Sequence, residues 1–384
     1  MKRLVLVLLA VLLLCGCGRN LADYTLNTVP TTLATEETKD STDETREFRE
    51  YATYPVERPS DRVIGNAFYY PDSRYVYYYD VDLRRRVVLC SQPNCTHSDD
   101  GCTAYLGGGE RNCYQVVGDT IYALVQNDVT VQLIAKNLVT GQRRLIWDLT
   151  PEKDETHIQY AWMSLDGNSA FVTYEQYDSL FEDGVLKETN RQYHAYDVDL
   201  TTGERKPLLD EKILSFSYPS FSRCTVTIAT EKYLLLRVPG YGYYSVNRET
   251  GMRTRICGNY EEARLTDIAV YREKSMSFVD KNTVCVYDGR TGSVTRYFQQ
   301  ENIGFQNLLD GRIIYNVRTG EGMEYDFFWY DLTTGEKQQF QKGIKGMVFS
   351  VLWETEDYFV GRYEGAYRFL SKQDFYNENY DAAF

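Results

Sequence analysis

The sequence predicts an all-β fold, a β-propeller, and three observations lead to that prediction. The pentapeptide Asn/Asp-x-x-Thr-Gly occurs five times, its copies recur at intervals near forty residues, and no amphipathic helical pattern follows residue 18. Short runs rich in β-branched and aromatic residues flank the copies, as expected for strands. The five copies, called the repeat turns below, span residues 137–141, 199–203, 247–251, 288–292 and 331–335.

Each repeat turn is predicted to close a β-hairpin. An Asp or Asn side chain can accept a hydrogen bond from the backbone two residues on, which starts a turn. A glycine at the end of the turn adopts positive φ without a Cβ clash, as a type I turn followed by a bulge requires. The glycines expected at positive φ are Gly141, Gly203, Gly251, Gly292 and Gly335.

The spacing of the repeat turns predicts the number of blades. Successive closing glycines are 62, 48, 41 and 43 residues apart, and a period near forty with about four strands per unit is typical of propeller blades. Degenerate copies at 75–86 and 367–376 raise the number of units to seven. We therefore favour seven blades, with six and eight as the alternatives. An inserted loop is predicted at 175–190, and the segment 51–67 is expected to lend an outer strand to the last blade.

Residues 1–16 are predicted to be a lipoprotein signal peptide. Lys2 and Arg3 precede an apolar core at 4–14, which is too short to span a bilayer that needs about twenty apolar residues. The sequence Leu14-Cys15-Gly16-Cys17 then resembles the lipobox of bacterial lipoproteins, in which the cysteine at the position of Cys17 carries the lipid. A plain signal peptide is the alternative. We expect a chain anchored to the cell membrane through Cys17, on its extracytoplasmic face.

The chain after Cys17 is expected to divide into a tether and one domain. Residues 17–60 are rich in Thr and Glu and poor in apolar side chains, so they cannot bury enough apolar surface to offset their chain entropy. A flexible segment of that length reaches roughly 35 Å. Residues 61–384 carry the strand pattern and form the predicted propeller, which we expect to be monomeric.

The net charge of the chain argues against nucleic acid and anionic membrane surfaces as partners. The formal net charge is −13, and removal of Lys2 and Arg3 with the signal peptide makes it −15. No basic stripe is present, so we expect no nucleic-acid partner. An anionic membrane surface would repel such a body, which leaves the lipid as the membrane contact.

Residues 90–113, the Cys/His loop, hold the one local cluster of reactive side chains. The spacing C-x4-C-x-H-x4-C brings three thiols and an imidazole within thirteen residues, and a further cysteine follows eleven residues later. Such a set could form a tetrahedral structural zinc site, or the four cysteines could form two disulfides in any of three pairings. Export favours disulfides, whereas the histidine favours a metal. Free thiols are the third alternative. The residues concerned are Cys90, Cys95, His97, Cys102 and Cys113.

Two weaker features concern ligands. Tyr241, Tyr243 and Tyr244 could form an exposed aromatic platform for a sugar ring, although a hairpin with ordinary aromatic packing explains the same residues. The sequence contains no phosphate loop, nucleophile elbow or zinc-protease motif. Paired carboxylates for glycan cleavage need only closeness in space, so 55 acidic residues leave that chemistry open.

These features together resemble a known group of proteins. The lipobox, the polar tether and the repeated Asp-x-x-Thr-Gly resemble the extracytoplasmic propeller lipoproteins of Gram-positive bacteria, whose repeats are similar to those of TolB-like and quinoprotein-like propellers. The segment 90–102 resembles a cysteine-histidine segment of the same group. The chain lacks the regular Trp docking motif of quinoprotein enzymes, which argues against a quinone cofactor. The resemblance covers about 58–384 and implies a binding or assembly module.

The sequence thus favours a non-enzymatic binding or scaffold module for a protein, peptide or glycan. The alternative is an extracytoplasmic glycan hydrolase or lyase that uses carboxylates at the propeller channel. Histidine, the commonest general acid–base residue, occurs only three times, and one copy lies in the Cys/His loop. That scarcity leads us to prefer binding to catalysis.

Overall fold

The computed structural model describes residues 63–384 apart from several short segments. Those segments are 65–66, 73, 83, 99, 108–112, 127–129, 154, 183–184, 211–212, 214–223, 239–240, 258–269, 273, 320–321 and 323. The predicted signal peptide, the lipidated Cys17 and the predicted tether lie outside the described residues. Within the described part, no helix combines the length and the apolar character needed to cross a membrane.

The described strands form seven antiparallel sheets, in which each strand pairs only with its neighbours in sequence. Six sheets have four strands and the seventh has three. The first four sheets comprise β1 Val63–Ile64, β2 Ala67–Asp72, β3 Tyr75–Asp80 and β4 Arg85–Val88; β5 Cys113–Val117, β6 Thr120–Gln126, β7 Val131–Asn137 and β8 Arg143–Asp148; β9 Thr156–Asp166, β10 Ser169–Glu182, β11 Val185–Asp199 and β12 Arg205–Pro207; and β13 Thr225–Ala229, β14 Tyr233–Val238, β15 Gly242–Asn247 and β16 Arg253–Cys257.

The remaining sheets complete the chain. They comprise β17 Val270–Arg272, β18 Ser275–Asp280, β19 Thr283–Asp288 and β20 Ser293–Gln299; β21 Ile303–Leu309, β22 Arg312–Arg318, β23 Tyr325–Asp331 and β24 Lys337–Ile344; and β25 Ser350–Glu354, β26 Tyr358–Tyr363 and β27 Ala366–Ser371, followed by the short helices α5 Lys372–Tyr376 and η5 Tyr380–Ala382.

The sequence of each strand reflects its place in its sheet. The inner strand β22 reads Arg-Ile-Ile-Tyr-Asn-Val-Arg, and its central four residues are all buried. A strand whose two faces are both covered is mostly apolar, and in β22 Asn316 is the polar exception among the buried residues. The outermost strand β20 reads Ser-Val-Thr-Arg-Tyr-Phe-Gln and has no buried residue. The sheets therefore bury their inner strands and expose their outer ones.

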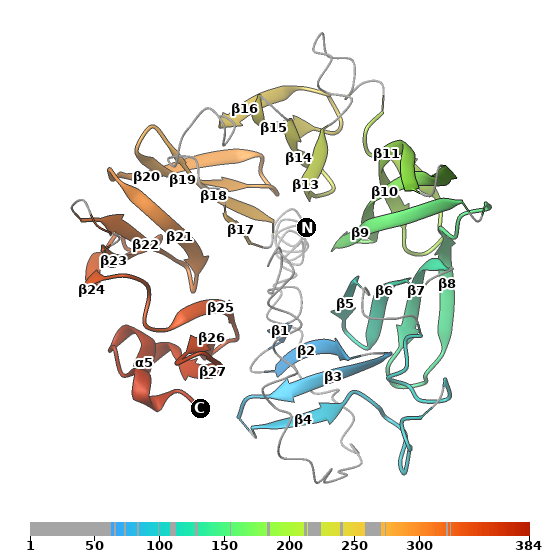
Figure 1. The fold of residues 1–384 in the computed structure, drawn as a ribbon, viewed down its shortest axis with the longest axis horizontal. Helices are drawn as coiled ribbons and strands as arrows, with labels where there is room; N and C mark the ends of the chain where they lie inside the picture. The colour runs from blue at the N-terminus through green and yellow to red at the C-terminus, as the bar shows by residue number, and fades with distance from the viewer. Residues whose placement is uncertain are drawn as a thin grey trace, which may run out of the picture.

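The sheets are set around a ring and pack face to face (Figure 1). Most of the hydrophobic core clusters join adjacent sheets; for example, Leu133 of the second sheet and Val172 of the third share one cluster. The first and seventh sheets also meet, because Val81, Val360 and Phe369 form a cluster. The rings of Tyr79 and Phe369 stack there at 4.9 Å. The prediction of an all-β propeller is confirmed, whereas seven blades remains a prediction.

The seventh sheet is completed by the C-terminus of the chain. Phe384 exchanges two backbone hydrogen bonds with Phe369 of β27, at 2.9 and 3.0 Å. Helix α5 buries Phe375 beside Phe359 of β26. The expected outer strand from 51–67 is not found there: Val63–Ile64 pairs with β2 in the first sheet, and residues 51–62 lie outside the described residues. The first and seventh sheets thus meet through side-chain packing.

The repeat turns have the predicted geometry. They connect the third and fourth strands of the second to sixth sheets. In each, the glycine N–H donates to the backbone carbonyl of the first residue at 2.8 or 2.9 Å. The Oδ1 of Asp331, for example, accepts from the amides of Thr333 and Thr334, both at 2.9 Å. The predicted positive φ is confirmed at all five glycines: Gly141 +72°, Gly203 +75°, Gly251 +71°, Gly292 +69° and Gly335 +73°.

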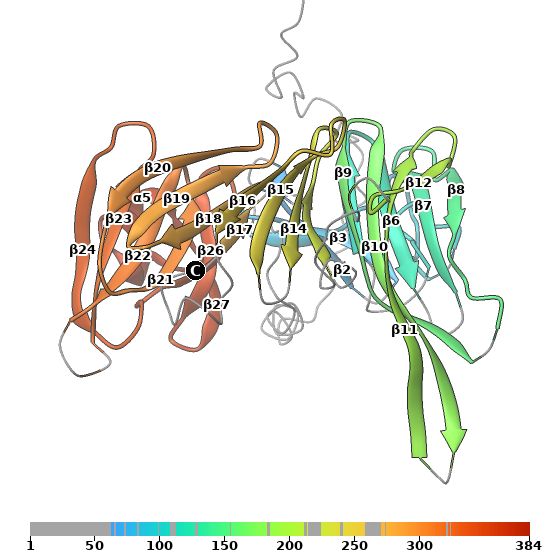
Figure 2. The ribbon, with the colours of Figure 1, turned by 90° about the horizontal axis from the view of Figure 1, so that it is seen from above.

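The prediction of an inserted loop at 175–190 is wrong. Strands β10 and β11 run through most of this segment and pair from Ser169 and Asp199 to Glu182 and Val185. Figure 2 shows this hairpin extending well beyond the other strands on one side of the molecule. The segment is polar because a two-stranded ribbon outside the body has two solvated faces, so the apolar alternation of an ordinary strand is absent.

Candidate metal centre

The Cys/His loop connects the first sheet to the second and returns to the first sheet along its path. The Leu89 amide donates to Val76 at 2.9 Å, and the Val76 amide donates to Ala104 at 3.0 Å. Tyr75 and Tyr105 form an isolated bridge. The two arms of the loop are therefore both fixed to β3, which leaves the residues between them to fold back on themselves.

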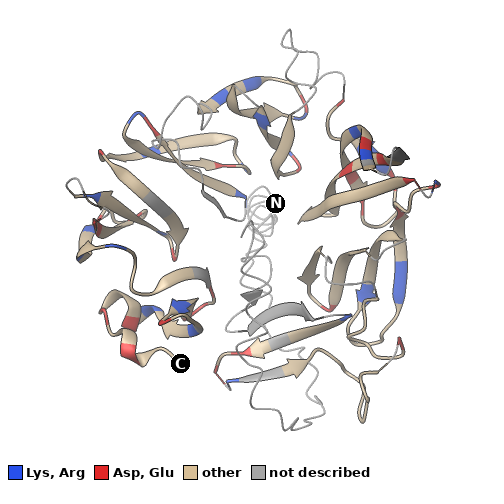
Figure 3. Ribbon diagram, in the orientation of Figure 1, with Lys and Arg blue, Asp and Glu red and all other residues tan. Residues whose placement is uncertain are grey.

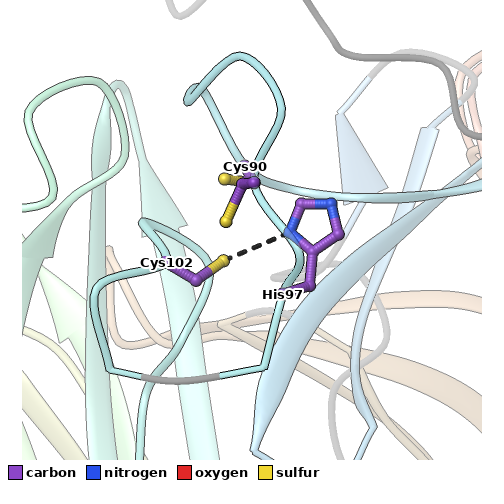
Figure 4. Close-up of side chains that lie close together, drawn as sticks. Cys90, His97 and Cys102 are labelled. Atoms are coloured by element: carbon purple, nitrogen blue, oxygen red, sulfur yellow. Dashed lines mark hydrogen bonds between the residues drawn. The ribbon is translucent and has the colours of Figure 1, made fainter.

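The loop brings four candidate ligands together. The sulfurs of Cys90, Cys95 and Cys102 and one ring nitrogen of His97 all lie within 4.8 Å of one another. Figure 4 shows the His97 ring directed at Cys102, and its Nδ1 lies 3.4 Å from the Cys102 sulfur. Sulfurs bound tetrahedrally to zinc at about 2.3 Å are roughly 3.8 Å apart. Small side-chain movements would convert this arrangement into a closed coordination sphere.

Two left-handed residues shape the loop so that the ligands converge. Asn94 has φ +58° and His97 has φ +53°. These positions reverse the chain on either side of Cys95, and Asn is among the residues that tolerate the left-handed region best. A left-handed histidine is less common, which indicates that its surroundings hold it there. Cys90 and Cys102 are buried, whereas Cys95 and His97 are half-buried.

The two buried thiols differ in acidity. Burial raises the pKa of Cys102 to about 12. Burial also acts to raise the pKa of Cys90, but hydrogen bonds from the Thr103 hydroxyl and from the amides of Gln92 and Thr103 outweigh it, so that pKa lies below the ordinary thiol value. The Thr103 hydroxyl lies 3.4 Å from the Cys90 sulfur. A metal must displace the Cys102 proton to bind, as thiolate ligation always requires.

Lys136 is a neighbour of the site that the sequence analysis did not identify. Its side chain is buried, and its Nζ donates to the carbonyl oxygens of Cys102 and Tyr105 at 2.9 and 2.5 Å. Burial lowers the pKa of Lys136, and attraction to Cys102 opposes that shift. A divalent ion with three thiolates leaves one excess negative charge, which this ammonium group would offset. Lys136 lies on β7, and nothing local in the sequence connects it to the loop.

The loop also holds the first repeat turn. The hydroxyl of Ser91 donates to the carbonyls of Leu138 and Val139, both at 2.8 Å. The Ser91 amide donates to the Thr103 hydroxyl at 2.9 Å. Ser91 thus contacts the neighbouring turn, and Thr103 joins Ser91 to the candidate ligand Cys90. The site therefore links the first two sheets.

Cys113 lies outside this group. It begins β5, its sulfur lies 3.7 Å from the Met163 carbonyl, and it packs against the cluster between the second and third sheets. The described cysteines form no disulfide with one another. One disulfide among Cys90, Cys95 and Cys102 would leave a third thiol and the imidazole unused. Among the described residues, this Cys3His set is the group that could bind a metal ion.

The three tyrosines predicted as a platform are not gathered on one face. Tyr241 and Tyr244 pack against the core cluster between the third and fourth sheets. Tyr243, next to Tyr244 on β15, packs against the cluster between the fourth and fifth sheets. Adjacent residues of a strand point to opposite faces, so a shared stacking surface does not form.

Comparisons with known proteins are limited to the fold. No protein-family model and no curated protein matches the chain. Among solved structures, an oligogalacturonate lyase in complex with manganese is similar over 79% of this chain and 85% of its own, at 9% identity and a TM-score of 0.45. TolB from Acinetobacter baumannii is similar over 73% of this chain and 65% of its own, at 12% identity and a TM-score of 0.33. These values say nothing about activity.

Proposed function

We propose that this protein is a lipid-anchored, extracytoplasmic, seven-bladed propeller that binds a protein, peptide or glycan without catalysis, and that zinc closes its Cys/His loop. The projecting hairpin of β10 and β11 is the observation that carries the binding proposal. A propeller needs only four short strands per blade, and these two strands have 14 and 15 residues. Their extension beyond the sheet adds surface that the ring does not require.

The hairpin is suited to contact a partner. Near its tip, Leu180 is 53% exposed and Val185 is 58% exposed. Further back, Arg191 forms ion pairs with Glu175 and Glu188, and charges of both signs occur along these strands (Figure 3). Exposed apolar residues near the tip of a charged, paired stem form a preorganised binding element, which loses less entropy on association than a flexible loop would.

The binding proposal is tested by comparing the wild-type protein with Leu180→Asp/Val185→Asp on native cells. Photo-crosslinking should capture a discrete partner with wild type and lose it in the double variant. Leu145→Asp is the matched control, because Leu145 is also an exposed apolar residue but lies on β8. Equal crosslinking by all three proteins contradicts the role of the hairpin.

The choice between binding and catalysis needs a separate measurement. The purified full-length chain is incubated with peptidoglycan fragments, plant and host glycans and peptides, and both binding and products are recorded. We expect binding without products. Turnover of a glycan that is abolished by changing one carboxylate would establish the hydrolase or lyase alternative.

Zinc is proposed because the donor set suits it. Three thiolates and one imidazole form a closed tetrahedral set, typical of structural zinc sites. Metal analysis should find about one zinc per chain, retained in Cys113→Ser and lost in Cys102→Ser. Alkylation without reductant, followed by intact-mass measurement, distinguishes the alternative. A zinc-free protein in which two loop cysteines resist alkylation contains a disulfide instead.

A further inference from the structure

A small cavity lies between the sixth and seventh sheets, far along the chain from the Cys/His loop. Its volume is about 150 Å³. Strands β21, β22 and β23 supply one wall, and β25 with the connection that precedes it supplies the other. Gly346 and Ser350 are exposed and mark its mouth, whereas Leu309, Ile314 and Phe327 are buried at its floor.

The cavity is lined mainly by apolar residues, with Asn307, Asn316 and Ser350 as its polar ones. Asn316 lines it and is only 7% exposed, and its Oδ1 has no hydrogen-bond partner in the described part of the chain. Burying an acceptor without a donor is unfavourable, because the bond it made to water is not replaced. An occupant that donates one hydrogen bond would restore that bond.

The backbone beside Asn316 leaves space for its side-chain oxygen. The pairing of β21 with β22 shifts register between Ile303 and Phe305, with Gly304 at the irregularity. A Cβ at Gly304 would lie 2.9 Å from the Asn316 Oδ1 and 2.9 Å from the Tyr325 ring. Glycine at this position therefore leaves room for the carbonyl oxygen. The register irregularity and the unpaired oxygen occur at the same place in the sheet.

We propose that this cavity is a binding site for an apolar ring that carries one hydrogen-bond donor, such as an indole or a phenol. Leu309, Ile314 and Phe327 contact the ring, and Asn316 accepts the hydrogen bond from its N–H or O–H group. A cavity of about 150 Å³ can hold a molecule the size of benzene, whereas a water molecule accounts for about 30 Å³.

The site is tested with indole and with indene, which has a similar shape but no N–H donor. Ligand-observed NMR on the purified full-length chain measures both affinities. We expect indole to bind at least about fivefold more tightly than indene, since one hydrogen bond of ordinary strength distinguishes them. Equal affinities, or no binding of either compound, overturn the proposal; the second result is the one expected if water fills the cavity.

Two variants connect the binding to the cavity. Asn316→Leu, of similar size, should remove the preference for indole while indene still binds. Met347→Trp, at the half-buried wall, should abolish binding of both compounds, and circular dichroism confirms that each variant is folded. Unchanged indole binding in both variants places the compound elsewhere and overturns the proposal.

The same chemistry could be presented by a free metabolite or by a tryptophan side chain of a peptide. A blocked tripeptide, glycine-tryptophan-glycine, is therefore compared with indole. Binding of the peptide at least tenfold tighter than indole identifies a peptide ligand, and weaker binding of the peptide identifies a free small molecule. In both cases the Met347→Trp variant must bind neither the peptide nor indole.

Discussion

The first and last repeat turns share a sequence pattern and a backbone geometry but not an environment. Gly141 and Gly335 have φ values of +72° and +73°. A Cβ at Gly141 would lie 2.9 Å from Thr103 in the Cys/His loop, whereas at Gly335 the one nearby atom is the Tyr330 hydroxyl at 3.4 Å. The local turn is therefore the same, while the cost of changing it depends on what packs against it.

The largest effect is expected at Gly203, because this repeat turn packs against backbone of the neighbouring sheet. A Cβ there would lie 2.6 Å from the carbonyl oxygen of Ile146 in the neighbouring sheet, and backbone cannot move aside as a side chain can. Gly203→Ala should lower the free energy of unfolding by about 2–5 kcal/mol, which combines left-handed strain and overpacking. Urea unfolding measures it. If Gly203→Ala and Gly335→Ala lower the free energy of unfolding equally, the distinction between packed and open turns is wrong.

Removal of the proposed zinc is the next largest expected effect. If zinc is held at about one hundred times its dissociation constant, chelation should destabilise the protein by about 3 kcal/mol. Thermal unfolding with and without a chelator measures the shift. Cys102→Ser should melt like the chelated wild type and show no response to chelator. A chelator effect of the same size in Cys102→Ser would place the metal elsewhere.

Thr103→Val examines the contact between the Cys/His loop and the first repeat turn. Valine has nearly the same side-chain shape as threonine but no hydroxyl group. The variant therefore loses the donor to the Cys90 sulfur and the acceptor for the Ser91 amide. A destabilisation of about 1–3 kcal/mol is expected, because a buried amide is left without its partner. Denaturant unfolding measures it, and Thr333→Val on the last repeat turn is the matched control. Equal losses in the two variants would contradict the coupling.

Gly335→Ala should have a smaller effect, since only strain opposes it. The left-handed conformation costs a residue with a Cβ about 1–2 kcal/mol, and the structure shows space for the methyl group. Urea unfolding beside Gly203→Ala gives the comparison directly. A loss well above this range would show that the last turn is packed more tightly than the structure indicates.

The smallest expected effect is on the pH dependence of the protein's stability. Backbone hydrogen bonds from Thr202 and Thr334 are the main causes that hold the pKa values of Asp199 and Asp331 below the ordinary value. A lowered folded-state pKa gives stability that is present above the unfolded pKa, about 3.9, and is lost as pH falls through the folded value. Asp199→Asn/Asp331→Asn should therefore lose less stability between pH 6 and pH 3 than wild type. An unchanged pH dependence in urea unfolding would contradict this.

Much of the fold could be predicted because its determinants are local. The positive φ of the repeat-turn glycines follows from the Asx hydrogen bonds and from the absence of a Cβ. Both features are contained in the five residues of the turn. The Cys/His spacing likewise identified Cys90, Cys95, His97 and Cys102 as candidate zinc ligands, although it left two disulfides that include Cys113 as an alternative. The 175–190 segment was misjudged because a ribbon exposed on both faces has no apolar alternation for the sequence to display.

The sequence by itself determined the repeat, the turn geometry and the set of candidate ligands, since each depends on neighbours within about a dozen residues. The tertiary structure decided that Lys136 lies behind Cys102, that Cys113 points to Met163, and that Asn316 lines a cavity with its oxygen unpaired. It also decided that the first and seventh sheets meet at Phe369. Those contacts arise where separate sheets pack together, and packing depends on side-chain shapes from distant segments that no local pattern contains.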